Sequence, residues 1–319
     1  MFLAGIDEAG YGPLVGPLAV GWSLFHVPDP ETDLWRICAR STVRRPERPR
    51  QERRLWVDDS KRVHSGPLGR RRLERTVAAF RALTAAPEAA GLEAWLSEPP
   101  APSSRWLRTA PWLRRCAGPL CPSVAAERAQ LDAGLLDQDL GRGGCAVAGF
   151  GARAVPAAEW NALTAEHGKA GGLFLVVAEV LRHLLRRAGV APLRIECDRH
   201  GARRSYRQAL ERALAPDRLL VHAEERSSSL YTLEFGRQQV QIRFAEGADG
   251  RRFPVALASL AAKQTRERLM DLWNAWFASR LPGIRPTKGY ASDGKRWLAE
   301  AGPRLSELGL EEAQVRRYR

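Results

Sequence analysis

Four acidic residues stand where regular elements of this sequence end or begin. Asp7 and Glu8 follow a short apolar run and precede a glycine-rich turn, in the stretch GIDEAGYGP at residues 5–13. Asp198 directly follows the stretch LRIEC, and Asp249 comes shortly before a long helical pattern. Strand ends and helix starts are where open α/β sheets place their functional groups. We therefore expect these four carboxylates to form one site.

The chemistry of such a site follows from its charge. Neighbouring carboxylates repel one another, so a cluster of four is stable only when cations bind it. Hard oxygen ligands that leave coordination positions open favour Mg²⁺ or Mn²⁺. Two such ions about 3.5–4 Å apart activate water and stabilise the leaving oxygen in phosphodiester cleavage. Taken singly, each acid is better explained as a surface or capping residue, so the prediction depends on the four together.

The basic residues predict an anionic partner. The chain has 319 residues, with 50 Lys and Arg against 36 Asp and Glu, and a formal net charge of +14. Nearly all of the basic residues are Arg, because Lys occurs only at positions 61, 169, 263, 288 and 295. Arg suits bidentate contact with phosphate. Charge alone therefore favours nucleic acid as the partner, with a codon bias towards Arg and Ala as the alternative explanation.

The cysteines and the apolar segments predict a soluble cytoplasmic protein. The five cysteines form no CxxC pair, which indicates a reducing compartment with neither a zinc site nor a disulfide framework. The start MFLAGIDEAG lacks a basic region and reaches acids too early for a signal peptide. The apolar stretch GGLFLVVAEVLRHLL is interrupted by Glu179 and Arg182, which favours a buried helix over a membrane span. We expect a monomer without membrane contact.

The order of elements predicts a mixed α/β sheet with helices on both faces. Apolar patterns predict strands at residues 2–7, 18–25, 145–152, 193–197, 219–224 and 238–244. They predict helices at 68–83, 171–187 and 203–214, and a long one that begins near Pro254 and ends before Pro282. Strands that first pair locally and then alternate with helices are typical of this architecture.

Two segments leave alternatives open. The basic run STVRRPERPRQERR, residues 41–54, is broken by prolines and predicts a solvated loop, with a dedicated nucleic-acid arm as the alternative. Residues 87–140 are predicted to be irregular. Their tryptophans, Trp95, Trp106 and Trp112, are predicted to be buried anchors of an inserted subdomain rather than stacking platforms for bases.

Five motifs, in order along the chain, resemble those of type 2 ribonucleases H, the bacterial ribonuclease HII and HIII group. They are GIDEAGYGPLVGP from Gly5, DDSK from Asp58, IECDRHG from Ile195, ADGRRFPVALASLAAKQTRERLM from Ala248, and KGYASDGKRWLAEAG from Lys288. The resemblance implies a ribonuclease H-like catalytic domain over residues 1–280, with an insertion at about 66–142. A helical, substrate-contacting segment would follow over residues 281–319.

The resemblance also implies roles for individual residues. Asp7, Glu8, Asp198 and Asp249 would be the catalytic carboxylates that bind two Mg²⁺ or Mn²⁺ ions. The substrate-binding residues would be Gly10, Tyr11, Gly12, Ser60, Lys61, Ser259, Lys263, Lys288 and Tyr290. The implied activity is a metal-dependent endonuclease, a hydrolase that cleaves the RNA strand of RNA/DNA hybrids or of ribonucleotide-containing duplexes.

The sequence departs from the family pattern at two motifs. Tyr11 stands where the HII motif has Arg, in a turn that contacts the ribonucleotide 2′-hydroxyl in the family. The family's His in the last motif is replaced near Gly294 and Lys295. The alternatives to a ribonuclease are a nucleic-acid-binding module of the same fold without cleavage, or a related nuclease that acts on DNA structures. Retention of all four acids favours an enzyme, and Tyr11 favours continuous hybrid over an isolated ribonucleotide.

Overall fold

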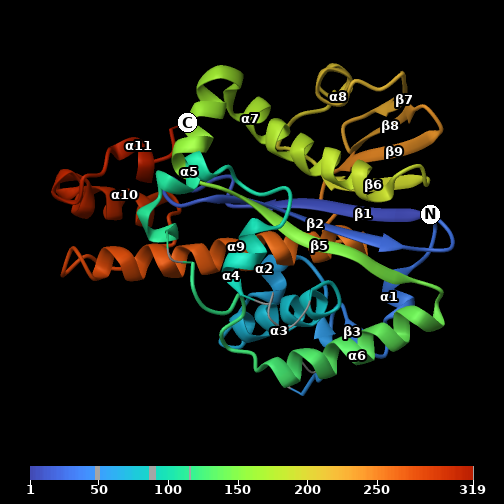
Figure 1. Ribbon diagram of the computed structural model, residues 1–319, viewed down its shortest axis with the longest axis horizontal. Helices are drawn as coiled ribbons and strands as arrows, with labels where there is room; N and C mark the ends of the chain where they lie inside the picture. Colours follow the sequence, from blue (N-terminus) through green and yellow to red (C-terminus); the bar gives the residue numbers. More distant parts are fainter. Residues whose placement is uncertain (47–50, 86–90, 115, 319) are drawn as a thin grey trace.

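Seven strands form a central sheet in the computed structural model (Figure 1). The structure describes residues 1–46, 51–85, 91–114 and 116–318. The strand order is β5-β2-β1-β6-β9-β8-β7. The strands are β1 (Phe2–Ala9), β2 (Leu18–His26), β5 (Ala146–Val155), β6 (Leu193–Asp198), β7 (Arg218–Glu224), β8 (Ser228–Phe235) and β9 (Gln238–Ala245). β1 pairs antiparallel with β2 and parallel with β6, and β6 pairs parallel with β9, so the sheet is mixed, as predicted.

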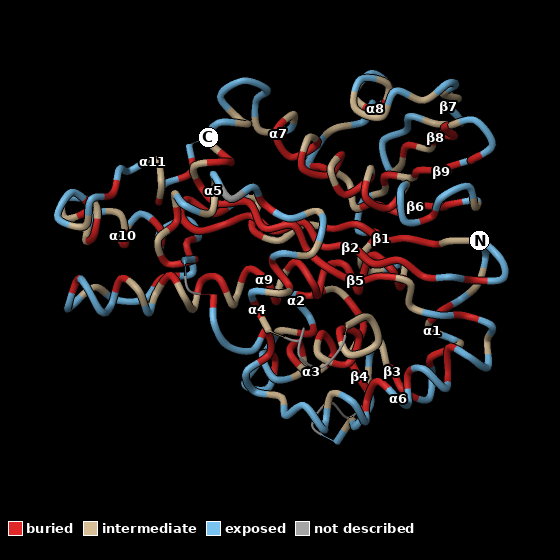
Figure 2. Tube along the Cα trace, in the orientation of Figure 1, coloured by how far each residue is buried: buried red, intermediate tan, exposed pale blue. Residues whose placement is uncertain are grey.

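Helices pack on both faces of this sheet, which confirms the predicted α/β architecture. The long helix α9 (Phe253–Ala278) covers one face, and α7 (Ala157–Ala188) with α8 (Arg207–Leu214) covers the other (Figure 1). Side chains of β1 alternate between the two cores, because successive strand residues point to opposite faces. Leu3 belongs to the core beside α9, whereas Ala4 and Ile6 belong to the core beside α7. Figure 2 shows the buried residues concentrated along β1, β2 and the helices that flank them.

The segment between β2 and β5 packs on the α9 side. It contains a two-stranded parallel sheet, β3 (Thr42–Val43) and β4 (Leu55–Trp56), and the helices α1 (Leu34–Ile37), α2 (Ser60–Val63), α3 (Gly69–Ala82), α4 (Leu92–Ser97), α5 (Ser104–Arg108) and α6 (Ala126–Arg142). Trp95 and Trp112 are buried, and the indole of Trp95 donates a 2.8 Å hydrogen bond to Thr265 of α9. These two tryptophans are therefore anchors, as predicted, while Trp106 is half-buried.

The C-terminal segment returns to the start of the chain. It contains α10 (Ala291–Ala301), α11 (Glu312–Val315) and three-residue helical turns at Gly302–Arg304 and Ser306–Leu308; a further such turn lies at Pro111–Leu113. Val15 and Arg316 form an isolated antiparallel bridge. The last described residues therefore lie beside the turn that follows β1.

Three predictions about elements were wrong. The stretch 87–140 is not irregular, because it contains α4, α5 and most of α6. Only a narrow stripe of α6, including Ala133, Leu136 and Leu140, is buried, so the helical pattern of apolar residues is weak. Strand β8 was missed, since its sequence SSLYTLEF begins in serines rather than in an apolar run. Helix α7 is divided by a non-helical backbone at Gly168 (φ 67°, ψ 171°); its second part confirms the helix predicted at 171–187, whereas its first part, which begins at Ala157, was missed.

The structure also bears on the cysteines and on the apolar segments. The five cysteines, Cys38, Cys116, Cys121, Cys145 and Cys197, are free and buried. Among the described residues, no helix combines the length and the apolarity that a membrane crossing requires. Residues 47–50 of the basic run, and residues 87–90 and 115 of the stretch predicted to be irregular, lie outside the described residues.

Candidate active site

The structure brings the four predicted acids to one edge of the sheet. Asp7 and Glu8 lie near the end of β1, and Asp198 is the last residue of the neighbouring β6. Asp249 lies in the loop that leads from β9 to α9. Because β1, β6 and β9 are adjacent and parallel, their carboxyl ends meet at the same edge. We call Asp7, Glu8, Asp198 and Asp249 the carboxylate cluster.

Burial raises the pKa of every carboxyl group in this cluster, and repulsion from nearby carboxylates raises it further. Burial raises the pKa of Asp7 well above its usual range, and the charges of Glu8 and Asp198 raise it further. Burial, followed by the charge of Asp198, raises the pKa of Glu8 to about 7. The pKa of Asp198 rises to about 6, mainly through burial and also through the charge of Asp249. The four groups therefore interact as one electrostatic unit.

Protein hydrogen bonds orient the cluster but do not neutralise it. Asp198 accepts a 2.9 Å hydrogen bond from the backbone N–H of Ala248, which ties the end of β6 to the loop that carries Asp249. The side chain of Ser259 lies beside Asp7 and lowers its pKa. Across the described residues, no Lys, Arg or His nitrogen lies within 4.0 Å of any of the four carboxylates. Their negative charge is therefore left for another partner.

The cluster fits hard divalent cations by its chemistry. Four carboxylates without a positive protein partner are the donor set and the charge that Mg²⁺ or Mn²⁺ prefers. However, in the part of the chain that the structure describes, no three His, Cys, Asp or Glu side chains are arranged as a metal site. The ligands are thus gathered at one edge without forming a closed coordination shell.

Two glycines bring α9 close to the cluster. A Cβ atom on Gly5 of β1 would lie 2.1 Å from the backbone of Pro254, and one on Gly21 of β2 would lie 2.0 Å from the carbonyl of Ala258. Any larger residue at either position would push the helix away. This close approach places Ser259, which is buried, beside Asp7.

Lys61 lies beside the carboxylate cluster. Its backbone N–H donates a 2.8 Å hydrogen bond to the side chain of Asp59, which caps α2. The charge of Lys61 lowers the pKa of both Glu8 and Asp249, which burial otherwise raises. The hydroxyl of Ser60 accepts a 2.9 Å hydrogen bond from Ser259, which links α2 to α9.

Lys263 and Lys288 both lie near His64. The ammonium of Lys263 forms a 2.6 Å ion pair with Glu267, one helical turn further along α9. Burial lowers the pKa of His64, and the charges of Lys263 and Lys288 lower it further. Lys288, His64 and Glu267 line a cavity of about 720 Å³, whose lining includes none of the four acids.

The glycine turn, residues 10–12, follows the carboxylate cluster directly. Gly10 has a φ of +92°, and a Cβ atom there would lie 2.5 Å from the Nε of Arg266, so only glycine fits. Gly12 is exposed, with open space where a Cβ would lie. Tyr11 packs edge-to-face on Trp160 of α7, with ring centroids 6.0 Å apart. The turn thus exposes Gly12 to solvent, whereas Gly10 is buried and the ring of Tyr11 packs on α7.

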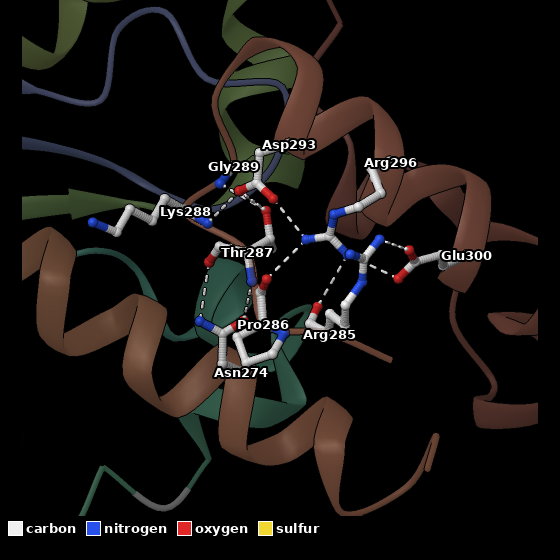
Figure 3. Close-up of polar contacts among 9 residues, drawn as sticks. All are labelled: Asn274, Arg285, Pro286, Thr287, Lys288, Gly289, Asp293, Arg296 and Glu300. Atoms are coloured by element: carbon white, nitrogen blue, oxygen red, sulfur yellow. Dashed lines mark hydrogen bonds and ion pairs between the residues drawn. The ribbon is translucent and has the colours of Figure 1, made fainter. Parts of the chain in front are cut away.

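Hydrogen bonds fix the loop that precedes Tyr290 (Figure 3). Asp293 accepts hydrogen bonds of 2.8 Å from the hydroxyl of Thr287 and from the backbone N–H of Lys288. The carbonyl of Gly289 in turn accepts a 2.8 Å hydrogen bond from the N–H of Leu14. Tyr290 remains 41% exposed and available for contact.

Two buried arginines complete the connection between the turn and the loop. The Arg266 guanidinium lies 4.7 Å from the ring centroid of Tyr290 and donates a 2.7 Å hydrogen bond to the carbonyl of Lys288. Arg317 donates to the carbonyls of Gly10 and Tyr11. Sequence reasoning missed Arg317, because its partners are backbone atoms and one arginine among so many carries no signal.

Comparisons with known proteins find similarity among solved structures. No protein-family model matches the chain, and no curated protein matches it. The chain is similar to ribonuclease HII of Archaeoglobus fulgidus, solved in a complex with PCNA, at 16% identity over 100% of this chain and 95% of that one, with a TM-score of 0.42. It is similar to ribonuclease H2 of Pyrococcus horikoshii at 16% identity, over 99% and 92%, with a TM-score of 0.41. It is also similar to ribonuclease H3 of Aquifex aeolicus at 14% identity, over 99% and 71%, with a TM-score of 0.40.

Proposed function

We propose that this chain is a metal-dependent endonuclease that hydrolyses the RNA strand of RNA/DNA hybrids or of ribonucleotide-containing duplexes. One observation carries the proposal: a cluster of four partly or fully buried carboxylates, without a positive partner among the described residues, lies in a chain with a net charge of +14. Such a site attracts cations, while the rest of the molecule attracts a polyanion. Metal-assisted cleavage of a nucleic acid requires both properties.

The residues around the cluster have separate tasks in this proposal. Two Mg²⁺ or Mn²⁺ ions held by Asp7, Glu8, Asp198 and Asp249 would supply an activated water and charge stabilisation at the departing 3′ oxygen. Ser259 lies beside Asp7 and lowers its pKa, and the N–H of Ala248 orients Asp198. Lys61 adds a positive charge beside Glu8 and Asp249, where it attracts the phosphate to be cleaved.

Recognition of RNA is assigned to the glycine turn and to Tyr290. A 2′-hydroxyl both donates and accepts hydrogen bonds, and it is the group that distinguishes RNA from DNA. The exposed backbone at Gly12 offers close approach to a sugar. The exposed ring of Tyr290, held by Arg266, offers a flat surface for sugar packing.

A cleavage assay tests the proposal. The protein is incubated with end-labelled all-DNA, hybrid and single-ribonucleotide duplexes, each in Mg²⁺ and in Mn²⁺, beside the Asp7→Asn variant. The proposal expects cleavage of the RNA-containing duplexes, with a 3′-hydroxyl product, and none by the variant. Cleavage of all-DNA duplex would instead favour a nuclease for DNA structures. Binding without cleavage would favour a nucleic-acid-binding module of the same fold. One observation supports that alternative: the described residues contain no preformed group of metal ligands.

A further inference from the structure

Three arginines surround one buried carboxylate at the edge of the candidate active site. Asp58 is 1% exposed. The guanidinium nitrogens of Arg44 and Arg45 each lie 3.7 Å from its carboxylate oxygens, and that of Arg62 lies at 3.4 Å. Arg44 and Arg45 come from the basic run after β3, and Arg62 comes from α2. We call Arg44, Arg45 and Arg62 the arginine cluster.

The charges of this cluster do not balance. Asp58 supplies one negative charge against three positive ones, so the group carries a net charge of two. The arginine side chains remain open to solvent, with exposed fractions of 36% for Arg44, 64% for Arg45 and 52% for Arg62. Like charges held this closely repel one another, so an added anion stabilises the arrangement.

The geometry of the cluster is fixed by neighbouring groups. The guanidinium of Arg44 lies 4.6 Å from the ring centroid of Trp35, and its Nε is buried without a hydrogen-bond partner among the described residues. Asp58 accepts a 2.9 Å hydrogen bond from the N–H of Asp59, which orients the carboxylate. Planar guanidinium groups match the oxygens of a phosphate, and all three side chains are partly exposed to solvent.

The cluster adjoins the carboxylate cluster. Asp58 begins the DDSK stretch, in which Ser60 and Lys61 reach Ser259 and the acids. The pKa of Asp249 is raised first by burial and then by the charges of Asp59 and Asp58. An anion on the arginine cluster therefore lies within electrostatic range of the site where cleavage is proposed.

We propose that Arg44, Arg45 and Arg62 form a binding site for a backbone phosphate of the substrate duplex, outside the cleaved bond. The identity of the ligand rests on the proposed function, since a nucleic-acid substrate is what brings a phosphodiester to this position. The basic run is then a nucleic-acid contact rather than only a solvated loop. It fixes the register of the duplex against the acids.

Salt dependence of binding tests the contact. The Arg45→Gln/Arg62→Gln variant, called the cluster variant, leaves Arg44 paired with Asp58. Its control is Arg212→Gln/Arg237→Gln, which removes the same charge from exposed positions on α8 and on the β8–β9 turn. All proteins carry Asp7→Asn, so that duplex binding is measured without cleavage. The cluster variant should show a log–log salt slope shallower by about 0.9 per lost phosphate contact, while the control keeps the wild-type slope. Equal slopes for the two variants, at equal melting temperatures, would overturn the proposal.

Neutralised phosphates then locate the contact. Duplexes with a short run of ribonucleotides carry a single methylphosphonate at successive positions. Protein with an intact cluster should lose affinity about tenfold at one or two adjacent positions, and the cluster variant should lose nothing further there. The same positional loss in both proteins would refute the assignment. Stabilisation by inorganic phosphate without any methylphosphonate effect would also refute it, in favour of a free-phosphate site. Absence of duplex binding by every protein would instead contradict the proposed function itself.

Discussion

Arg317 donates a 2.6 Å hydrogen bond to the backbone carbonyl of Gly10, although 307 positions separate the two residues. A second bond of 2.9 Å reaches the carbonyl of Tyr11, and Arg317 is only 3% exposed. The carbonyl and the N–H of one peptide unit point in opposite directions. Arg317 therefore turns the N–H groups of Tyr11 and Gly12 away from itself. The end of the chain fixes the orientation of the turn beside the acids.

Loss of this guanidinium should weaken substrate recognition. Hydrogen bonds from a charged donor contribute about 1.5–3 kcal/mol each, so Arg317→Met should lower kcat/KM for hybrid by about tenfold or more. The matched control is Arg316→Met, because Arg316 is exposed and pairs with Glu312. We expect the loss for Arg317→Met to appear mainly in KM and in discrimination against all-DNA duplex. Equal kinetics for the two variants would show that the turn does not need Arg317.

Asp7→Asn should abolish cleavage and alter the response to metal. The variant removes one of four mutually repelling carboxylates, so without metal its melting temperature should equal or exceed that of the wild type. Mg²⁺ or Mn²⁺ should then stabilise the wild type more than the variant, since the ions bind the folded site. Thermal unfolding with and without metal measures both effects. Asp137→Asn, at an exposed position of α6, should respond to metal as the wild type does.

The fold was largely predictable from the sequence because its signals are local. β1, β2, β6 and α9 agree with the predicted ranges to within a few residues, since apolar alternation and a long apolar helix are both visible in the chain. The grouping of the acids followed from the same patterns, because parallel strand ends share an edge. Lys263 forms an ion pair with Glu267 rather than with an acid of the carboxylate cluster, a choice among nearby carboxylates that the motif alone does not resolve.

Contacts between distant backbone segments were not predictable. Arg317 has no apolar pattern around it and binds carbonyl oxygens, which every residue possesses. The arginine cluster depends on a fold that brings Arg44 and Arg45 to Asp58. In both cases the sequence shows an arginine, and only the tertiary structure shows which of the many arginines acts.

His183 should contribute a loss of stability in acid. This side chain is buried in α7 against Trp22, with ring centroids 4.7 Å apart, and burial, followed by the charges of Arg187 and Arg186, lowers its pKa from 6.5 to about 4. Between these values His183 binds more protons in the unfolded chain than in the folded one, so its contribution to the free energy of unfolding falls as pH falls from 6.5 to 4. The raised pKa values of Glu8 and Asp198 act in the opposite direction. The contribution of His183 amounts to at most about 3 kcal/mol.

Urea unfolding at several pH values checks this expectation. His183→Phe keeps an aromatic ring against Trp22 and removes the titrating group, so its free energy of unfolding relative to that of the wild type should rise as pH falls from 6.5 to 4. The control His26→Gln, at the exposed end of β2, should show the same pH dependence as the wild type. A pH dependence of His183→Phe equal to that of the wild type would contradict this role of His183.

Tyr11→Arg should change which RNA-containing duplex is preferred. The Tyr11 ring packs on Trp160, and the ammonium of Lys169 lies 4.4 Å from the centroid of the Tyr11 ring. A positive charge therefore already lies beside position 11, where the family motif has Arg. A tyrosine cannot neutralise a phosphate, whereas an arginine can contact one with two parallel hydrogen bonds. We expect wild-type protein to cleave continuous hybrid better than an isolated ribonucleotide, and Tyr11→Arg to shift the ratio towards the isolated ribonucleotide. Tyr11→Phe keeps the packing and should leave the ratio unchanged. If Tyr11→Arg also leaves the ratio unchanged, position 11 serves only to pack the turn against α7.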